Sequence, residues 1–153
     1  ISETINVTAN IDNLAFELIK RLKSQQDKNR KGNADEKNFL KRRVICGAHE
    51  TLKFAQSGRV KLIFYAKNMD ENNLRAASNF HSLQIVCPLA GIPMIEVLTR
   101  KELSRIMNKF PYVAVVGVID FSGFERETED IVKNWKIHDS CKLFHIDQSS
   151  LLP

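Results

Sequence analysis

The chain has 153 residues and a formal net charge of +5, and its 43% hydrophobic and 27% charged residues favour one globular domain with a buried core. No apolar run reaches the length of a membrane span, so we expect no membrane association. Three cysteines, odd in number and far apart, argue against a disulfide framework and favour a reducing compartment, the cytoplasm and also the nucleus.

A stripe of apolar residues at helical spacing predicts a first helix from about Asp12 to Gln26. The stripe consists of Ile11, Leu14, Ala15, Leu18, Ile19 and Leu22. The polar stretch Asp27–Lys37 predicts a loop. Residues 1–40 therefore form an N-terminal helical extension and a basic loop. The abrupt start at Ile1 leads us to expect a fragment of a longer protein.

Basic residues concentrate between Lys20 and Lys61, where 13 Lys and Arg residues stand against four acidic ones. The rest of the chain has 10 basic and 14 acidic residues. A basic patch attracts phosphate groups, so this distribution favours RNA or DNA as the partner. A solvated linker within residues 24–38 is the alternative explanation for some of these charges.

A basic run, Lys41-Arg42-Arg43, leads into a short predicted strand, Arg43–Cys46, that ends at Gly47. A helix over His49–Ser57 should follow directly. Glycine lets the backbone approach a ligand closely, and a helix N-terminus presents free N–H groups to an anion. We therefore expect a ligand-binding turn here.

Three side chains share one face of that helix: His49, Glu50 and Lys53. Glu50 offers an acceptor and Lys53 a cation, so the site can hold a phosphate and read a donor edge beside it. The alternative is an ordinary surface Glu–Lys pair that only stabilises the helix.

Nearly continuous apolar runs predict three buried strands, Val60–Ala66, Ile92–Leu98 and Val113–Ile119. Amphipathic helices alternate with them. The first ends near Gly91, and the second extends to about Asn108 from a capping box.

That capping box consists of Thr99 and Glu102, and the pair Ser122 and Glu125 predicts a second one at the start of the last helix. The tail, residues 138–153, has weak signals of a short strand or disorder. This alternation predicts an α/β fold, a three-layer α/β/α sandwich with a mixed, mostly four-stranded sheet.

Two further segments are candidate binding elements. Arg100, with Lys101 and Arg105, lies near a helix start, where cations are unfavourable unless an anion binds; a solvated helix face is the alternative. Phe110 lies in the Asn108–Tyr112 loop, which could rest against an unstacked base. We assign the other aromatic side chains considered to the core: Phe39, Phe64, Phe121, Phe124 and Trp135.

Metal binding and catalysis have little support in the sequence. His138, Cys141 and His145 have a spacing that could hold a metal, but a fourth ligand is not evident. The sequence contains no P-loop, nucleophile elbow, HExxH motif or dinucleotide-binding glycine fingerprint. The carboxylates Glu127, Glu129 and Asp130 fit an exposed helix face. We therefore expect no metal, no cofactor and no enzymatic activity.

The order of these motifs resembles the kink-turn-binding ribosomal-protein superfamily over about Lys41–Asp120. The segments that carry the resemblance are Gly47–Lys53, Gly58–Ala66, Ile92-Pro93, Thr99–Arg105 and the final valine-rich strand. Within the superfamily, the SECIS-binding subfamily is most similar, through Lys41-Arg42-Arg43, Arg100–Arg105 with Asn108-Lys109, and Pro111–Gly117. Two positions depart from the pattern: His49 replaces Asn or Arg, and Ser104 replaces a glycine.

The resemblance implies that residues 41–137 bind a kink-turn-like RNA with sheared G·A pairs. By it, Gly47 allows close approach, Glu50 accepts from a guanine edge, Lys53 contacts non-canonical pairs or phosphates and Arg100 meets the backbone. The residues we expect at the interface are Arg42, Arg43, Gly47, His49, Glu50, Lys53, Arg100, Asn108, Lys109, Phe110 and Tyr112.

The RNA implied is the SECIS element of a selenoprotein mRNA, which supports selenocysteine incorporation at UGA. The ribosome and the selenocysteine-specific elongation factor are then expected partners. Three alternatives stay open: a ribosomal or small-ribonucleoprotein kink-turn binder, a protein-binding adaptor on the same fold, and the RNA-binding part of a 2′-O-methyltransferase. The absence of a cofactor-binding domain counts against the last.

Overall fold

The computed structural model describes the backbone of residues 2–32, 42–69 and 72–151 and the side chains of residues 10–28, 42–69 and 72–140. The elements follow in the order α1 (Ser2–Gly32), β1 (Val44–Cys46), α2 (Ala48–Gln56), β2 (Leu62–Tyr65), α3 (Leu74–Ala90), β3 (Met94–Glu96), α4 (Arg100–Met107), β4 (Val115–Val118) and α5 (Glu125–Leu151). The strands form one mixed sheet in the order β1-β4-β2-β3. The predicted α/β class with a four-stranded mixed sheet is confirmed.

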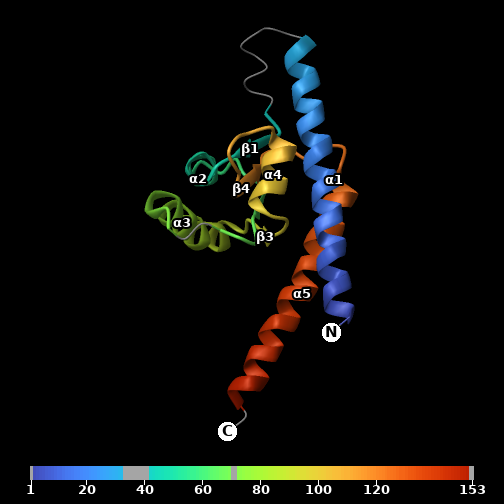
Figure 1. Ribbon diagram of the computed structural model, residues 1–153, viewed down its shortest axis with the longest axis vertical. Coiled ribbons are helices and arrows are strands. Elements are labelled where there is room, and N and C mark those ends of the chain that lie inside the picture. Colours follow the sequence, from blue (N-terminus) through green and yellow to red (C-terminus); the bar gives the residue numbers. More distant parts are fainter. Residues whose placement is uncertain (1, 33–41, 70–71, 152–153) are drawn as a thin grey trace.

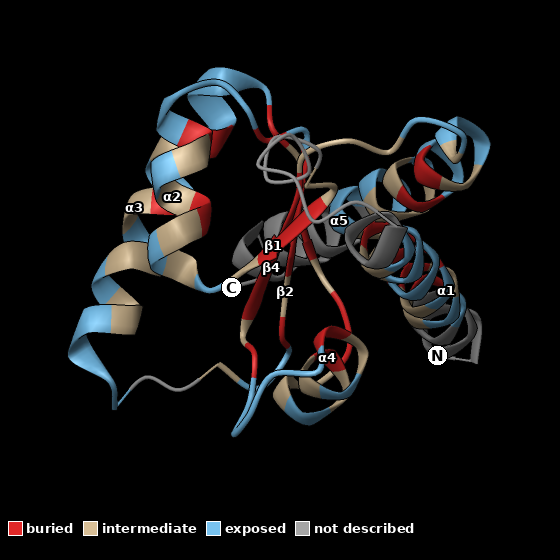
Figure 2. Cartoon of the chain, turned by 90° about the horizontal axis from the view of Figure 1, so that it is seen from above, coloured by how far each residue is buried: buried red, intermediate tan, exposed pale blue. Residues whose placement is uncertain are grey.

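Helices cover both faces of this sheet (Figure 2). Helices α2 and α3 pack together on one face, and α1, α4 and α5 lie on the other, where α1 and α5 run side by side (Figure 1). Each face has its own apolar cluster of buried side chains. The three-layer sandwich is therefore also confirmed. Among the described residues, no helix has both the length and the hydrophobicity needed to cross a bilayer.

Helix α1 is longer than its apolar stripe predicted. The stripe residues Ile11, Ala15, Leu18, Ile19 and Leu22 are buried, as expected. The predicted loop is wrong over residues 27–32, because the helix continues to residue 32. The ion pair between Lys23 Nζ and Asp27 Oδ1, at 2.7 Å and helical i,i+4 spacing, favours this continuation. Residues 33–37 of that prediction lie outside the described residues.

The capping box predicted at Ser122 is wrong. The Ser122 backbone N–H and hydroxyl both donate to Asp120 Oδ1, at 2.9 and 2.5 Å, and these bonds lower the pKa of Asp120. The Glu125 carboxylate instead accepts from the Gly123 N–H at 3.1 Å. The turn before α5 is therefore stabilised by the bonds from Ser122 to Asp120 and not by a capping box.

The tail is helical, which corrects the expectation of a short strand or disorder. Helix α5 continues to Leu151. Its sequence from Glu125 to Leu151 contains no glycine or proline, so no residue breaks the helix started by the buried Thr128 and Ile131. Amphipathic signals fade after His138, but helical backbone does not require a buried face at every turn.

The predicted buried strands are confirmed, although each is shorter than its apolar run. In the second run, Leu98 adopts φ 61°, a left-handed conformation that ends β3 before the run is complete. Helix α2 approaches β4 closely at Gly117, where an added Cβ would lie 3.0 Å from Thr51 Cγ2 and 3.1 Å from Ile45 Cγ1. This close packing fixes the position of α2 on the sheet.

Candidate functional site

The sheet topology brings the motifs that the sequence analysis singled out to one edge. Strand β4 is antiparallel to β1 and β2, and β2 is parallel to β3, so β1, β2 and β3 share one direction. Their carboxyl ends meet where β4 begins. The Gly47 N–H donates to Val115 O at 2.8 Å, which ties the end of β1 to the start of β4. We call this region, formed by residues 47–53, Arg100 and residues 108–112, the carboxyl edge.

Gly47 opens the tip of α2. Its φ of 100° and ψ of 140° belong to a region that residues with a Cβ rarely adopt, and no side chain caps the helix. The first N–H groups of α2 are therefore not covered by a capping side chain. An added Cβ would meet nothing within 4 Å, so only the backbone conformation, and not space, demands glycine here.

Replacing Gly47 with alanine is therefore a test of backbone strain alone. We expect Gly47→Ala to lower the free energy of unfolding by about 1–3 kcal/mol. Urea unfolding monitored by circular dichroism measures this loss, and Gly58→Ala is the matched control, because Gly58 has an ordinary left-handed φ of 74°. Equal effects of the two substitutions would contradict a special constraint at Gly47.

Glu50 is held in place by Arg42. Arg42 Nη1 donates to Glu50 Oε1 at 2.7 Å, and the two side chains are only 23% and 41% exposed. This bond orients the carboxylate and leaves Oε2 without a partner among the described residues. His49 and Lys53 on the same helix are exposed. Helix α2 therefore presents an oriented acceptor, the Glu50 carboxylate, and an exposed cation, Lys53.

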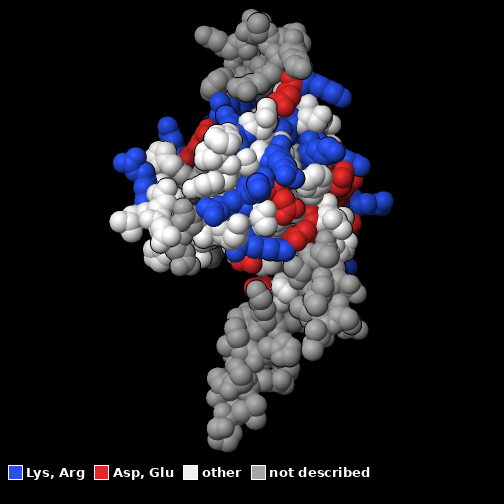
Figure 3. Space-filling view, viewed as in Figure 1, with Lys and Arg blue, Asp and Glu red and all other residues white. Residues whose placement is uncertain are grey.

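Arg100 and Tyr112 form a stacked pair at the same edge. The Arg100 guanidinium carbon lies 4.4 Å from the centroid of the Tyr112 ring. The predicted capping box of Thr99 and Glu102 is confirmed and fixes the start of α4, where Arg100 lies. Figure 3 shows Lys and Arg side chains gathered over α4 and beside it. A cation stacked on an aromatic ring offers a flat, positively charged surface.

The loop after α4 projects its aromatic side chain into solvent. Phe110 is 97% exposed, whereas Phe64 is fully buried. Asn108 takes a left-handed φ of 53°, and its N–H donates to Ser104 O. The Ser104 hydroxyl donates to Lys109 O. Ser104 therefore fixes the turn that leads from α4 into this loop.

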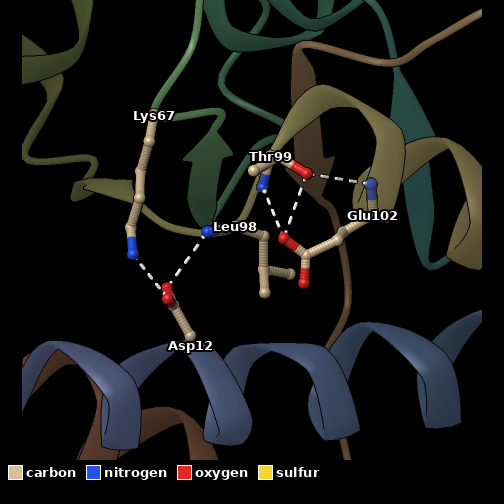
Figure 4. A network of polar contacts seen from close by, with 5 residues as sticks. All are labelled: Asp12, Lys67, Leu98, Thr99 and Glu102. Carbon is tan, nitrogen blue, oxygen red and sulfur yellow. Dashed lines mark hydrogen bonds and ion pairs between the residues drawn. The ribbon is translucent and has the colours of Figure 1, made fainter.

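Helix α1 fixes the turn between β3 and α4 (Figure 4). Asp12 Oδ1 accepts from the Leu98 N–H at 3.0 Å, and Asp12 Oδ2 pairs with Lys67 Nζ at 2.5 Å. These bonds hold Leu98 in its left-handed conformation. The direction in which the chain enters α4, and hence the place of Arg100, depends on this helix.

A cavity of about 150 Å³ lies beside Glu50, between α1, β1, α2 and the end of α4. Its polar lining residues are Lys23, Gln26, Arg42, Cys46, Glu50 and Lys109. Burial raises the pKa of the Cys46 thiol, which therefore stays protonated near neutral pH. The sequence analysis missed Lys23 and Gln26. Gln26 follows Leu22 at i+4 on the buried stripe, and this placement of a polar residue was the available signal.

Gln26 holds the start of β1. Its Oε1 accepts from the backbone N–H groups of Arg43 and Val44, at 2.7 and 3.0 Å. The Arg43 side chain points away from the carboxyl edge, because its Nη1 donates to Ser122 O at 2.8 Å in the turn before α5. The structure therefore separates Arg43 from the other predicted site residues. Lys41 lies outside the described residues.

No cluster of three potential metal ligands occurs among the described side chains. Of the residues weighed for a metal, Cys141 and His145 lie in α5, with side chains beyond those described. Glu129 and Asp130 are exposed on α5, and Glu127 is partly buried.

Comparison with known proteins places these features in context. Residues 33–126 match the family described as "Ribosomal protein L7Ae/L30e/S12e/Gadd45 family". The selenocysteine insertion sequence-binding protein 2 of Rattus norvegicus is 26% identical over 95 residues, which cover 61% of this chain and 11% of that protein. The Mus musculus protein named selenocysteine insertion sequence-binding protein 2-like is 28% identical over 88 residues, covering 56% and 8%. The chain thus spans about a tenth of the length of these relatives.

Solved structures share the fold. The Giardia lamblia 15.5kD RNA binding protein superposes with a TM-score of 0.64 at 19% identity, over 84% of this chain and 90% of that one. A protein of unknown function from Bacillus halodurans C has a TM-score of 0.54 at 20% identity, over 77% and 95%. At these identities the similarity establishes the fold alone.

Proposed function

Because the chain belongs to the ribosomal protein L7Ae/L30e/S12e/Gadd45 family, we propose that its carboxyl edge binds a kink-turn-like RNA internal loop with sheared G·A pairs. The observation that carries this proposal is the Glu50 carboxylate, oriented by Arg42 at the uncapped tip of α2. A carboxylate accepts from the donor edge of a base, whereas the phosphate backbone repels it. A carboxylate at this position would weaken a site that bound only phosphates.

The other side chains of the carboxyl edge fit complementary tasks. Lys53 and Arg100 offer cations to phosphates, and the exposed Phe110 can stack on an unpaired base. Affinity then comes from the cations, and specificity comes from Glu50, the helix tip and the loop. Nothing in this set requires a chemical step, so we propose a binding domain and not an enzyme.

We further propose that the RNA is a SECIS element in a selenoprotein mRNA. Similarity to two proteins named for binding the selenocysteine insertion sequence supports this choice over ribosomal RNA. The domain would then support selenocysteine incorporation at UGA, in the cytoplasm and also in the nucleus. The ribosome and the selenocysteine-specific elongation factor would be partners of the protein to which residues 41–137 contribute the RNA-binding domain.

Fluorescence anisotropy with four labelled RNAs tests both levels of this proposal. The RNAs are a SECIS hairpin, a generic kink-turn, the same hairpin with its G·A pairs replaced by G·C pairs, and a plain duplex. We expect the SECIS hairpin to bind roughly 100-fold more tightly than the duplex, and replacement of the G·A pairs to remove most of this difference.

The pattern of affinities separates the alternatives. Equal affinity for the SECIS hairpin and the generic kink-turn would favour a ribosomal or small-ribonucleoprotein type of binder. Equal affinity for all four RNAs would overturn the proposal and favour a protein-binding adaptor. Three exposed apolar side chains on α3, Leu74, Ile85 and Leu89, would then be the surface to test.

A further inference from the structure

Helix α1 lies outside the family match, which starts at residue 33, and yet it forms one wall of the cavity beside Glu50. Two of its side chains reach the cavity, three residues apart on one face. Gln26 is occupied by the backbone of β1, as described above. Lys23 is the other, and its side chain is only 16% exposed although it carries a charge.

Three cations meet around this cavity: Lys23 from α1, Arg42 before β1 and Lys109 after α4. All three act on the same thiol, since each lowers the pKa of Cys46 against the stronger effect of burial. Among the described residues, Glu50 is the one carboxylate in the lining, and one of its oxygens already bonds Arg42. Asp27 pairs with Lys23, so these described groups together leave an excess of one positive charge, which favours an anionic group.

We propose that Lys23 binds a backbone phosphate of the RNA at this cavity, which makes α1 part of the nucleic-acid interface. The inference rests on the proposed RNA-binding function and adds a contact to it. An ammonium group is a compact charge with three N–H donors. Asp27 Oδ1 takes one donor at 2.7 Å, which leaves the others to a phosphate oxygen.

The Lys23–Asp27 pair supplies a test in which two substitutions act in opposite directions. If Lys23 binds phosphate, Lys23→Gln should weaken SECIS hairpin binding about five- to tenfold, with a similar loss for a plain duplex. The slope of log affinity against log salt should fall by about 0.7–0.9. Asp27→Asn removes the carboxylate that competes for the ammonium group, so it should strengthen binding roughly twofold.

Helix α1 also offers a matched control pair. Glu17 and Arg21 form an i,i+4 ion pair on the exposed face of the same helix, with both side chains more than half exposed. Arg21→Gln removes the same charge, and Glu17→Gln removes the same kind of partner. We expect Arg21→Gln to weaken RNA binding by less than about twofold and Glu17→Gln to leave it unchanged. Circular dichroism melting of all four variants verifies that each is folded.

The outcomes are distinct. If wild-type protein binds the hairpin but Lys23→Gln and Asp27→Asn both leave the affinity and salt slope unchanged, Lys23 is only a structural ion-pair partner and the inference is overturned. Failure of the wild-type protein to bind RNA would instead defeat the proposed function. A third outcome is that inorganic phosphate at constant ionic strength raises the Tm of the wild type but not of Lys23→Gln, while Lys23→Gln binds RNA as tightly as the wild type. The cavity would then bind free phosphate, and the inference would be overturned.

Discussion

Glu50→Ala should remove most of the discrimination between a SECIS hairpin and a plain duplex while leaving the protein folded. A contact between a side chain and a base edge contributes about 1–3 kcal/mol of discrimination, so we expect affinity for the hairpin to fall roughly 10- to 100-fold. The same substitution removes a negative charge from a basic surface, so binding to the duplex should become slightly tighter. Anisotropy titrations with both RNAs measure these changes.

The opposite signs of the two effects separate a lost base contact from general damage. A misfolded variant would lose affinity for both RNAs, and a variant changed only in charge would gain affinity for both. Glu129→Ala is the matched control, because Glu129 is an exposed glutamate on α5, away from the carboxyl edge. Tighter binding of Glu50→Ala to both RNAs would remove the central contact of the proposed function.

Arg42 would preorganise the proposed contact between Glu50 and a base, because it positions the Glu50 carboxylate before RNA binds. Its bond to Glu50 Oε1 restricts the carboxylate while a neighbouring oxygen remains for the base. Preorganisation of this kind lowers the entropy lost on binding. If Glu50 makes the proposed contact, Arg42 supports it by orienting the carboxylate, in addition to adding to the attraction of the basic surface for phosphates.

The sequence predicted those parts of the fold that depend on local pattern. The glycine turn before α2, the capping box at Thr99 and the three apolar strands each carry their signal within a few residues. The cap at Ser122 was wrong because a nearer acceptor, Asp120, takes the Ser122 backbone N–H that Glu125 would accept in a capping box. A spacing rule cannot include that competition, because the choice depends on how the chain turns after β4.

Contacts between residues far apart in the sequence could not be predicted from local pattern either. The residue types at Lys23 and Gln26 are ordinary for a helix, and only the packing of α1 beside β1 gives them their partners. The same packing gives Asp12 its bond to Leu98 N–H, 86 residues along the chain. The expected residues 47–53 and 108–112 are contiguous in sequence, whereas the contacts of α1 beside them depend on packing that no local pattern records.

Asp12 and Gln26 together show why α1 matters to the carboxyl edge. They lie on the same side of the helix, and each accepts from the backbone of a segment that leads to site residues: Asp12 from the Leu98 N–H and Gln26 from the N–H groups at the start of β1. Asp12 holds the turn before Arg100, and Gln26 holds the strand that leads to Gly47. Because α1 is bonded at both places, it fixes the distance between the turn before Arg100 and the strand that leads to Gly47.

Gln26→Ala should accordingly destabilise the protein more than its size suggests. It leaves the N–H groups of Arg43 and Val44 without their acceptor, and Val44 is buried. Each unsatisfied buried donor costs about 1–3 kcal/mol, so we expect a loss of about 2–4 kcal/mol in the free energy of unfolding. This corresponds to a fall in Tm of roughly 5–15 °C, measured by differential scanning calorimetry.

Two variants show whether the carboxamide oxygen of Gln26 is responsible. Gln25→Ala changes the same residue type on the exposed side of the helix and should shift Tm by less than about 2 °C. Gln26→Glu retains an acceptor for both N–H groups and lies one turn from Lys23, so it should restore most of the stability that Gln26→Ala loses. If Gln26→Glu is as unstable as Gln26→Ala, an acceptor at this position is not sufficient to stabilise the start of β1, because glutamate retains both the side-chain stem and the acceptor oxygens. The hairpin affinities of the wild type, Gln26→Glu and Gln26→Ala provide a second measurement. They should follow the same order as the stabilities only if β1 transmits the position of α1 to Gly47 and Glu50.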